Sequence, residues 1–299
     1  MTAERTLVVI NPAAGSGRAR QRWAAVRDEA ARLFPFEEAF TEAPGHATTL
    51  AQHAVADGWQ RILAVGGDGT LHELANGLAN TRVALAALPC GTGNDFARSV
   101  GLAQPPRRLL QGLALGARRA VDLGQVQGRY YLNVAGVGFD AEVARLVNAM
   151  PRKGGGTVPY LLTAIREAFH YTCPELTIQV DDQTAQLPAP QLMVAVGNAS
   201  AYGGGMRICP GAAVDDGLLD VLSVGNLRGW ATLALLPKVF VGRHTGHPAV
   251  RYGRAATVRV TGPAEVALHA DGELLAGLPA TFTICPRALQ LWVPAAPPA

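Results

Sequence analysis

The sequence predicts a mixed α/β protein with two domains, and two features of the chain support this expectation. In the first part, short apolar strands at 6–10, 62–65 and 83–88 each lead into a glycine-rich turn and then a helical pattern. Beyond about residue 120, strands joined by Gly, Asp and Pro turns favour an antiparallel β-sandwich. We therefore expect a Rossmann-like α/β domain followed by a β-sandwich domain.

The first domain is expected to cover residues 1–124 and to alternate strands with helices. The strand at 62–65 lacks polar alternation, which is typical of a parallel strand buried on both faces. In chain order we expect strands at 6–10, 36–41, 62–65 and 83–88, and helices at 20–34, 47–57, 71–79 and 107–119, the last of them basic.

The second domain is expected to cover residues 125–299, and a strand at 289–293 within the segment 286–299 could return to the first domain. We expect sandwich strands at 130–135, 176–181, 191–197, 218–224, 257–261, 265–269 and 281–285, with helices or caps at 158–171 and 229–241.

The turn Gly66-Gly67-Asp68-Gly69-Thr70 links a buried strand to a helix with almost no side-chain bulk. Glycine permits left-handed backbone angles and close approach of a ligand, and the first amides of a helix favour a phosphate. Tight packing alone is the competing interpretation of such a turn. We interpret it as a phosphate cradle whose Asp68 could face a metal ion.

Two further turns of this kind follow strands, at 11–18 and at 89–96. The carboxyl ends of parallel strands share one edge of a sheet, where ligands bind in open α/β folds. Three such turns at one edge predict a phosphorylated ligand. The patterns G-x-x-x-x-G-K-[ST] and G-x-G-x-x-G are both absent, which disfavours a P-loop enzyme and a standard dinucleotide fold.

Composition and charge restrict the ligands and the cellular locations that we expect for this chain. A net charge of +3 and a pI near 8.8 suit an anionic ligand or membrane surface but fall well short of a nucleic-acid footprint. The four cysteines are scattered, so reduced thiols and a cytoplasmic location are expected. No signal peptide is visible, and the apolar stretch 230–241 is too short to span a bilayer. Any membrane contact is expected to be peripheral and transient.

Five motifs in order give the chain a family resemblance. N-P-x-x-G-x-G-R at 11–18, G-G-D-G-T-L-x-E at 66–73 and P-x-G-T-x-N-D-F-A-R at 89–98 resemble the catalytic domain of the diacylglycerol kinase and sphingosine kinase superfamily. The segments 212–221 and 269–273 match second-domain motifs, and the chain most resembles the bacterial soluble lipid kinases. The resemblance implies a first domain related to NAD kinases and phosphofructokinases, a β-sandwich, and a site in the cleft between them.

The resemblance also implies roles for individual residues. Glu273 would accept the proton of the lipid hydroxyl, and Asp68 and Asp95 would lie near the phosphates and Mg²⁺. Asp216, with the backbone carbonyls of Ala213 and Leu218, would hold a structural Mg²⁺. The implied nucleotide contacts are Asn11, Pro12, Ala13, Ala14, Gly15, Thr41, Gly66, Gly67, Asp68, Gly69, Thr70, Leu71, His72, Thr92 and Asp95.

Simpler interpretations of these residues stay open. Asp215-Asp216-Gly217 is also an ordinary β-turn sequence, and Asp271-Gly272 is a hairpin signal that would make Glu273 a solvated strand residue. His72 replaces the Asn of many bacterial members, and Arg18 stands where Lys is common. Both positions could change the choice of phosphate donor.

The expected activity is ATP- and Mg²⁺-dependent phosphorylation of a hydroxyl on diacylglycerol or a related lipid, presented by a membrane surface or a micelle. The alternatives are a soluble-metabolite kinase of the NAD kinase type and an inactive nucleotide- or lipid-binding regulator. Apolar residues at 202–206 and 230–236 could admit acyl chains, and basic residues at Arg107, Arg108, Arg152 and Lys153 could touch anionic headgroups. A homodimer is left open.

Overall fold

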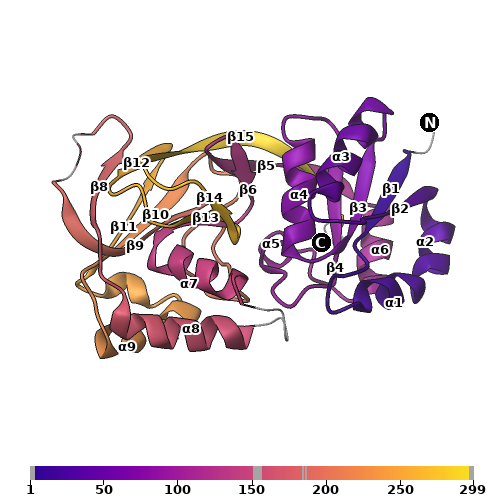
Figure 1. The fold of residues 1–299 in the computed structure, drawn as a ribbon. Helices are drawn as coiled ribbons and strands as arrows, with labels where there is room; N and C mark the ends of the chain where they lie inside the picture. The colour runs from indigo at the N-terminus through magenta and orange to yellow at the C-terminus, as the bar shows by residue number, and fades with distance from the viewer. Residues whose placement is uncertain (1–3, 151–156, 184, 186, 296–299) are drawn as a thin grey trace. The chain divides into compact units, whose positions relative to one another are not determined.

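The computed structural model describes residues 4–150, 157–183, 185 and 187–295, so Arg152 and Lys153 lie outside the described residues. The chain divides into two compact units (Figure 1). The first unit combines Met1–Leu123 with Pro286–Ala299, and the second is Gly124–Cys285. The first unit is therefore built from both ends of this chain, and each unit is described by itself below.

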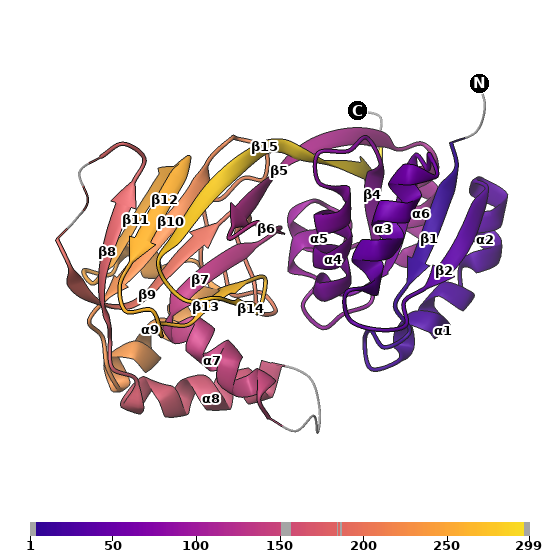
Figure 2. The same ribbon diagram turned by 45° about the horizontal axis from the view of Figure 1, so that its top comes forward.

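The first unit is a parallel sheet covered by helices on both faces (Figures 1 and 2). The strand order is β15-β4-β3-β1-β2. The strands are β1 (Thr6–Ile10), β2 (Phe36–Phe40), β3 (Arg61–Gly66), β4 (Ala84–Pro89) and the last part of β15 (Ala280–Val293). The helices are α1 (Arg18–Ala24), α2 (Arg27–Leu33), α3 (His46–Ala56), α4 (Asp68–Leu78), α5 (Asp95–Ser99) and α6 (Pro106–Ala114).

The order of strands reverses between β1 and β3. From β1 the chain moves outward to β2, whereas from β3 it moves the opposite way to β4. The two crossovers consequently lie on opposite faces, and the loops that follow β1 and β3 diverge from each other. Ligands bind outside the carboxyl ends of the strands at such a switch point in open α/β sheets.

Three helix predictions in this unit were wrong in detail. The predicted helix at 20–34 is two helices, and Trp23 and Arg27, on either side of the break, both donate to the Glu38 carboxylate of β2 at 2.7 Å. α4 begins at Asp68 and not at 71, because the glycine-rich turn already supplies the first helical residues. The basic segment 107–119 stops being helical at Ala114, and Arg118 and Arg119 belong to β5 (Ala117–Val126).

The second unit is an antiparallel β-sandwich, which confirms the predicted fold class. One sheet contains β7 (Val134–Gly138), β9 (Ala189–Gly197), β10 (Leu219–Gly225), β11 (Val250–Ala255), β13 (Leu268–Ala270) and β14 (Glu273–Leu275). The other contains β8 (Glu175–Val180), β12 (Thr257–Thr261), the first part of β15, the end of β5 and β6 (Arg129–Tyr131).

Alternation along the strands builds two cores in this unit. Val194 and Val196 of β9 face the interior of the sandwich, where they join Phe282 of β15, while Ala195 between them faces outward. The outward face packs against three helices, α7 (Phe139–Asn148), α8 (Thr157–His170) and α9 (Trp230–Phe240). The unit therefore has three layers.

The sequence missed some of these elements and misplaced others. β11 and α7 were not expected, β14 was indicated only by the hairpin signal at Asp271-Gly272, and the predicted strand 265–269 begins only at Leu268. The predicted strand 130–135 is divided into β6 and β7 at Leu132 and Asn133. At this break the backbone amides of Leu132 and Asn133 donate to the carboxylate of Asp271.

One buried histidine makes the stability of this unit depend on pH. His244, in the short 3-10 helix η1 (His244–Gly246), is fully buried, and its Nε2 lies 3.0 Å from the carbonyl oxygen of Ile208. Burial lowers the pKa of His244 below its ordinary value of 6.5, so the folded protein keeps this ring neutral to a lower pH than the unfolded chain does. As the pH falls through 6.5, the unfolded chain therefore binds more proton at His244 than the folded protein does.

We expect the free energy of unfolding to fall as pH decreases through and below about 6.5, because unfolding then takes up a proton at His244. A single group contributes at most about 1.4 kcal/mol per pH unit. Urea unfolding of the wild type and His244→Gln at pH 7.5 and 5.5 should show a smaller decrease for the variant. Exposed His53→Gln is the control, and equal decreases for the wild type and His244→Gln would contradict this explanation.

Among the described residues, no helix is long and apolar enough to cross a membrane. All four cysteines are free thiols. Burial raises the pKa of the Cys90 and Cys209 thiols, which keeps both protonated and unreactive at neutral pH.

Candidate functional site

Asn11 joins the turn after β1 to the turn after β3. Its backbone amide donates to Val65 at 3.0 Å, and its side-chain Nδ2 donates to the hydroxyl of Thr70 at 2.9 Å. Its Oδ1 accepts the amide of Ala13 at 3.0 Å, and its carbonyl accepts the amide of Ala14 at 3.1 Å. One side chain thus fixes the loop of Pro12 and its neighbours against the start of α4.

The three glycine-rich turns pack backbone against backbone. Gly15 has φ +60°, and a Cβ placed there would lie 2.1 Å from the carbonyl oxygen of Cys90. A Cβ on Gly67 would lie 3.1 Å from Cα of Gly91, and one on Gly66 would lie 2.6 Å from Cβ of Thr70. Glycine is required at these contacts by space, and by backbone angle as well at Gly15. The structure therefore brings the three turns to one edge of the sheet of the first unit.

Asp68 anchors the third turn. It is the first residue of α4, and its Oδ2 accepts the backbone amide of Asn94 at 2.6 Å. Asn94 has φ +53° and precedes α5, and its side chain exchanges two hydrogen bonds with the backbone of Gly91 at 2.9 and 2.8 Å. A carboxylate therefore holds the loop that carries Thr92, which is itself exposed.

The amino end of α4 offers main-chain donors to an anion. The first amides of a helix have no intrahelical acceptor, and the helix dipole is positive at that end. A Cβ on Gly69 would meet no atom within 4 Å, so the main chain is approachable there. Leu71 and His72 are buried, so a contact from either to a bound ligand would have to use the backbone. Thr41 follows β2 and donates its amide to Ile10 at 2.9 Å.

Asp95 differs from the other residues that the sequence placed near the phosphates. It is 3% exposed, and its Oδ1 lies 2.6 Å from the guanidinium of Arg98 in the next turn of α5. The ion pair directs this oxygen towards Arg98. A contact between Asp95 and a metal-bound phosphate stays a prediction.

Glu273 lies on a tight hairpin in the second unit. Asp271 and Gly272 have φ values of +50° and +86°, as a type I′ turn requires, so the hairpin signal in the sequence is confirmed. The Glu273 side chain is 40% exposed, and its Oε2 lies 2.9 Å from Nη2 of Arg129 on β6. The carboxylate is therefore accessible to a substrate and oriented by a cation.

Asp271 fixes the same hairpin from the chain that separates β6 from β7. Its carboxylate accepts the amides of Leu132 at 2.7 Å, Asn133 at 2.9 Å and Val134 at 3.2 Å. Its own amide donates to Val134 at 3.0 Å. Three donors converge on one carboxylate, so the turn that leads into Glu273 has little freedom to move.

The buried side chain of His269, on β13, is hydrogen-bonded to the turn of this hairpin. Nε2 of His269 lies 3.1 Å from Oδ2 of Asp140, and Nδ1 accepts the amide of Gly272 at 3.3 Å. Tyr202 stacks on the His269 ring and donates to the same carboxylate oxygen at 3.3 Å. Burial, together with Asp140, raises the pKa of Tyr202, so its hydroxyl stays protonated. Sequence reasoning missed Arg129 and Asp140, since no local pattern marks either residue.

Two of the predicted Mg²⁺ ligands of the second unit, Asp216 and Leu218, lie on one turn. Oδ1 of Asp216 accepts the amide of Leu218 at 3.1 Å, and Oδ2 lies 3.7 Å from Nη1 of Arg254. Nearby Asp220 is fully buried and accepts the Tyr252 hydroxyl, while its Oδ2 has no hydrogen-bond partner. Burial raises the pKa of Asp220, and the charge of Asp216 adds to this effect.

These oxygens fit Mg²⁺ in chemistry. Mg²⁺ takes one or two carboxylates and completes its shell with other oxygens and water, and the backbone carbonyls of Ala213 and Leu218 would supply such oxygens. Among the described residues, no group of three His, Cys, Asp or Glu side chains could hold a metal. A site here would therefore depend on main-chain oxygens and water as much as on carboxylates.

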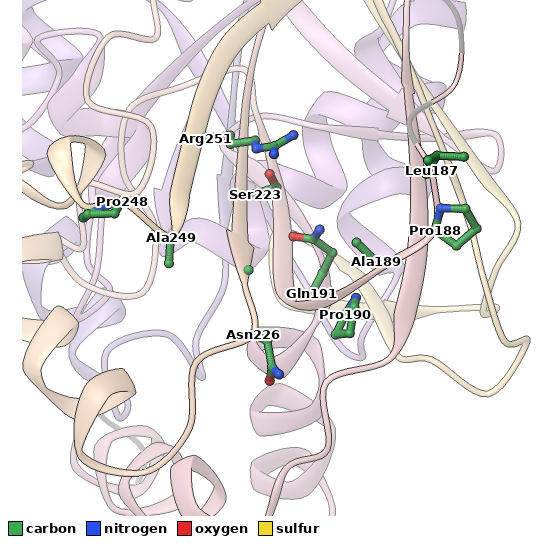
Figure 3. A pocket seen from close by; sticks show the side chains of 11 residues that line it. Leu187, Pro188, Ala189, Pro190, Gln191, Ser223, Asn226, Pro248, Ala249 and Arg251 are labelled. Atoms are coloured by element: carbon green, nitrogen blue, oxygen red, sulfur yellow. The ribbon is translucent and has the colours of Figure 1, made fainter.

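The cavity in Figure 3 lies elsewhere in the second unit. Its volume is about 550 Å³, and its lining includes Gln191, Ser223 and Arg251 together with prolines of the segment 187–190. The lining has no carboxylate and none of the predicted site residues. This cavity therefore lacks the groups that phosphoryl transfer needs.

Two family models match the chain. The diacylglycerol kinase catalytic domain matches residues 5–126, and the YegS C-terminal NAD kinase beta sandwich-like domain matches residues 133–293. Together they account for both units.

Named relatives match most or all of this chain. A "Diacylglycerol kinase" of Mycobacterium tuberculosis is 33% identical over 82% of this chain and 80% of its own length. A "Probable lipid kinase YegS-like" of Pseudomonas aeruginosa is 33% identical over 100% of this chain and 97% of its own. A crystal structure from Bacillus anthracis str. Sterne, described as a candidate diacylglycerol kinase, is 26% identical with a TM-score of 0.80 over 98% of both chains.

Proposed function

Because this chain belongs to the diacylglycerol kinase family of lipid kinases, we propose that it transfers the γ-phosphate of ATP to a hydroxyl of diacylglycerol or a related lipid. The observation that carries the proposal is the meeting of three glycine-rich turns where the strand order reverses between β1 and β3. That arrangement presents backbone donors and almost no side-chain bulk to a chain of phosphates.

Each turn has a distinct part in holding the nucleotide. The first turn of α4 supplies main-chain donors, Asn11 holds the loop 11–15 against it, and Asp68 keeps the third turn beside them through Asn94. Fixed donors of this kind stabilise the charge that spreads over the transferred phosphoryl group, at no cost of reorganisation. Mg²⁺ bound with the nucleotide would neutralise the remaining phosphate charge, and the Asp216 turn would hold a second, structural Mg²⁺.

Glu273 is the proton acceptor in this proposal. A carboxylate beside the attacking hydroxyl lowers the barrier by accepting its proton as the phosphorus–oxygen bond forms. The Arg129 guanidinium orients this carboxylate at 2.9 Å, and the I′ turn of Asp271 and Gly272 sets its position on β14. The lipid acceptor is presented by a membrane surface or a micelle.

Transfer of label from [γ-³²P]ATP tests the proposal directly. The full chain is incubated with Mg²⁺ and micelles that contain diacylglycerol, monoacylglycerol, ceramide or sphingosine, and parallel reactions contain NAD. Label that appears in an organic extract with diacylglycerol supports the proposal. Label on NAD alone would establish a soluble-metabolite kinase, and nucleotide binding without transfer to any acceptor would establish an inactive regulator.

A further inference from the structure

We propose that the outer faces of α8 and α9 in the second unit form a docking surface for bilayers that contain anionic phospholipids. This inference rests on the proposed function, because a lipid acceptor is held in a bilayer and no described helix of this chain can cross one. A peripheral enzyme with such a substrate must bind the surface of the membrane.

Large apolar side chains project into solvent along one face of α8. Positions 158, 161, 162, 165 and 169 recur at helical spacing, so they share one side of the helix. Val158 is 67% exposed and Leu162 is 62% exposed, and Phe169 is half exposed. This stripe of apolar groups is not needed to build the core.

The inner faces of both helices already supply the core contacts. Ala168 of α8 and Leu235 and Val239 of α9 are buried against the outer side of the sandwich sheet. Helix α9 has its buried positions three and four residues apart, and Trp230 lies outside that stripe. The exposed apolar side chains are therefore additional to the packing of the unit.

Trp230 extends the stripe from α8 to α9. Its indole is 78% exposed and contacts the Phe169 ring edge-on, with centroids 5.3 Å apart. The amide of Gly229 donates to the carbonyl of Ala168 at 2.6 Å, which fixes the start of α9 against the end of α8. Figures 1 and 2 both show the two helices side by side. The apolar ridge is formed by Val158, Leu161, Leu162, Ile165, Phe169 and Trp230.

Exposed cations occur on and beside α8 and α9, and acids are scarce there. Arg166 lies between ridge positions on α8 with a 79% exposed side chain, and Arg228, Lys238 and Arg243 are exposed on or beside α9. Glu167, which is largely buried, is the single acidic residue of segments 157–171 and 226–243. Exposed basic side chains beside an apolar face match the headgroups and acyl boundary of an anionic membrane.

The same features disfavour a protein partner. The centre of a protein interface is depleted of charge, whereas the exposed Arg166 side chain directly borders the apolar ridge along α8. A second copy of the chain would bring the cations of the two surfaces together without matching acids. Trp230 at the end of the ridge is the side chain most favoured at the boundary between water and lipid.

The chain has a built-in probe for this surface. Of its four tryptophans, Trp23, Trp59 and Trp292 are buried, so Trp230 is the one that vesicles could reach directly. We expect vesicles with 30% phosphatidylglycerol to shift tryptophan emission to shorter wavelength, and brominated lipids to quench it. Neither effect should occur with Trp230→Phe, although that variant should still sediment with the vesicles.

Vesicle sedimentation without ATP measures the contribution of the ridge itself. The double variant Leu162→Ser/Phe169→Ser should bind at least about tenfold more weakly, because two apolar side chains no longer enter the membrane. Leu115→Ser is the matched control, since Leu115 is 79% exposed in the first unit. Raising the salt concentration, or omitting phosphatidylglycerol, should weaken wild-type binding. Thermal melting establishes that the variants fold.

Two results would overturn the proposal. One is equal vesicle binding by the wild type and the double variant, with no quenching of Trp230. The other is a wild-type dimer in vesicle-free sedimentation velocity that the double variant disperses, since the ridge would then join two copies. Because binding is measured without ATP, a chain that docks through the ridge yet phosphorylates no lipid would refute the proposed function alone.

Discussion

Replacing Glu273 with Gln is expected to lower kcat for lipid phosphorylation by about 10²- to 10⁴-fold. The amide keeps the size of the side chain and can still accept a hydrogen bond from Arg129, which lies 2.9 Å from the carboxylate. It cannot accept the proton of an attacking hydroxyl. The measurement is the initial rate of label transfer from [γ-³²P]ATP to diacylglycerol micelles.

The affinity for ATP separates this effect from a loss of structure. Glu273 belongs to the second unit, so Glu273→Gln should bind nucleotide as the wild type does. Glu265→Gln changes an exposed carboxylate of the same unit and should leave the rate unaltered. Undiminished phosphorylation by Glu273→Gln would remove this residue from the chemistry.

Gly15→Ala is expected to destabilise the first unit and to weaken ATP binding by at least about tenfold. The new Cβ would lie 2.1 Å from the carbonyl oxygen of Cys90, so the loop after β1 must separate from the loop after β4. Overpacking of this kind costs about 1–3 kcal/mol. Thermal denaturation and isothermal titration with ATP measure the two effects.

Gly17→Ala is a matched control for the backbone angle. Gly17 also has positive φ, at +87°, but a Cβ there would meet no atom within 4 Å. Both variants share the cost of a left-handed alanine, about 1 kcal/mol, and only Gly15→Ala adds the collision. Equal losses in the two variants would show that the contact between the loops is unimportant.

The sequence revealed the strands and turns of the first unit because each has a local cause. Val8 and Leu63 lie in short apolar runs that are typical of a buried parallel strand, and the glycines that follow mark the turns. Helix ends were less accurate. Nothing in the local sequence shows that the chain breaks between Trp23 and Arg27, where the cause is Glu38 on a neighbouring strand.

The support around Glu273 shows the same limit more clearly. The I′ turn could be predicted, because Asp-Gly is a local signal. The partners of that hairpin could not be, since Leu132 and Asn133 donate to Asp271 from 139 and 138 residues away. Arg129 reaches Glu273 across 144 residues. Such contacts exist only once the sandwich has formed, so no single stretch of sequence contains them.

The last strand has a consequence for how this protein is made. Gln290 and Leu291 of β15 pair with β4, and Trp292 is buried in the first unit with its indole donating to Leu113 at 2.8 Å. On the ribosome, β1 to β4 emerge first, yet the edge of β4 lacks this neighbour until the second unit has been translated. Until then the nascent first unit has an unpaired edge on β4, and such an edge can pair with strands of other chains. A chain that ends before residue 286 lacks the β15 residues that cover β4, so we expect it to aggregate more readily than the chain that contains them.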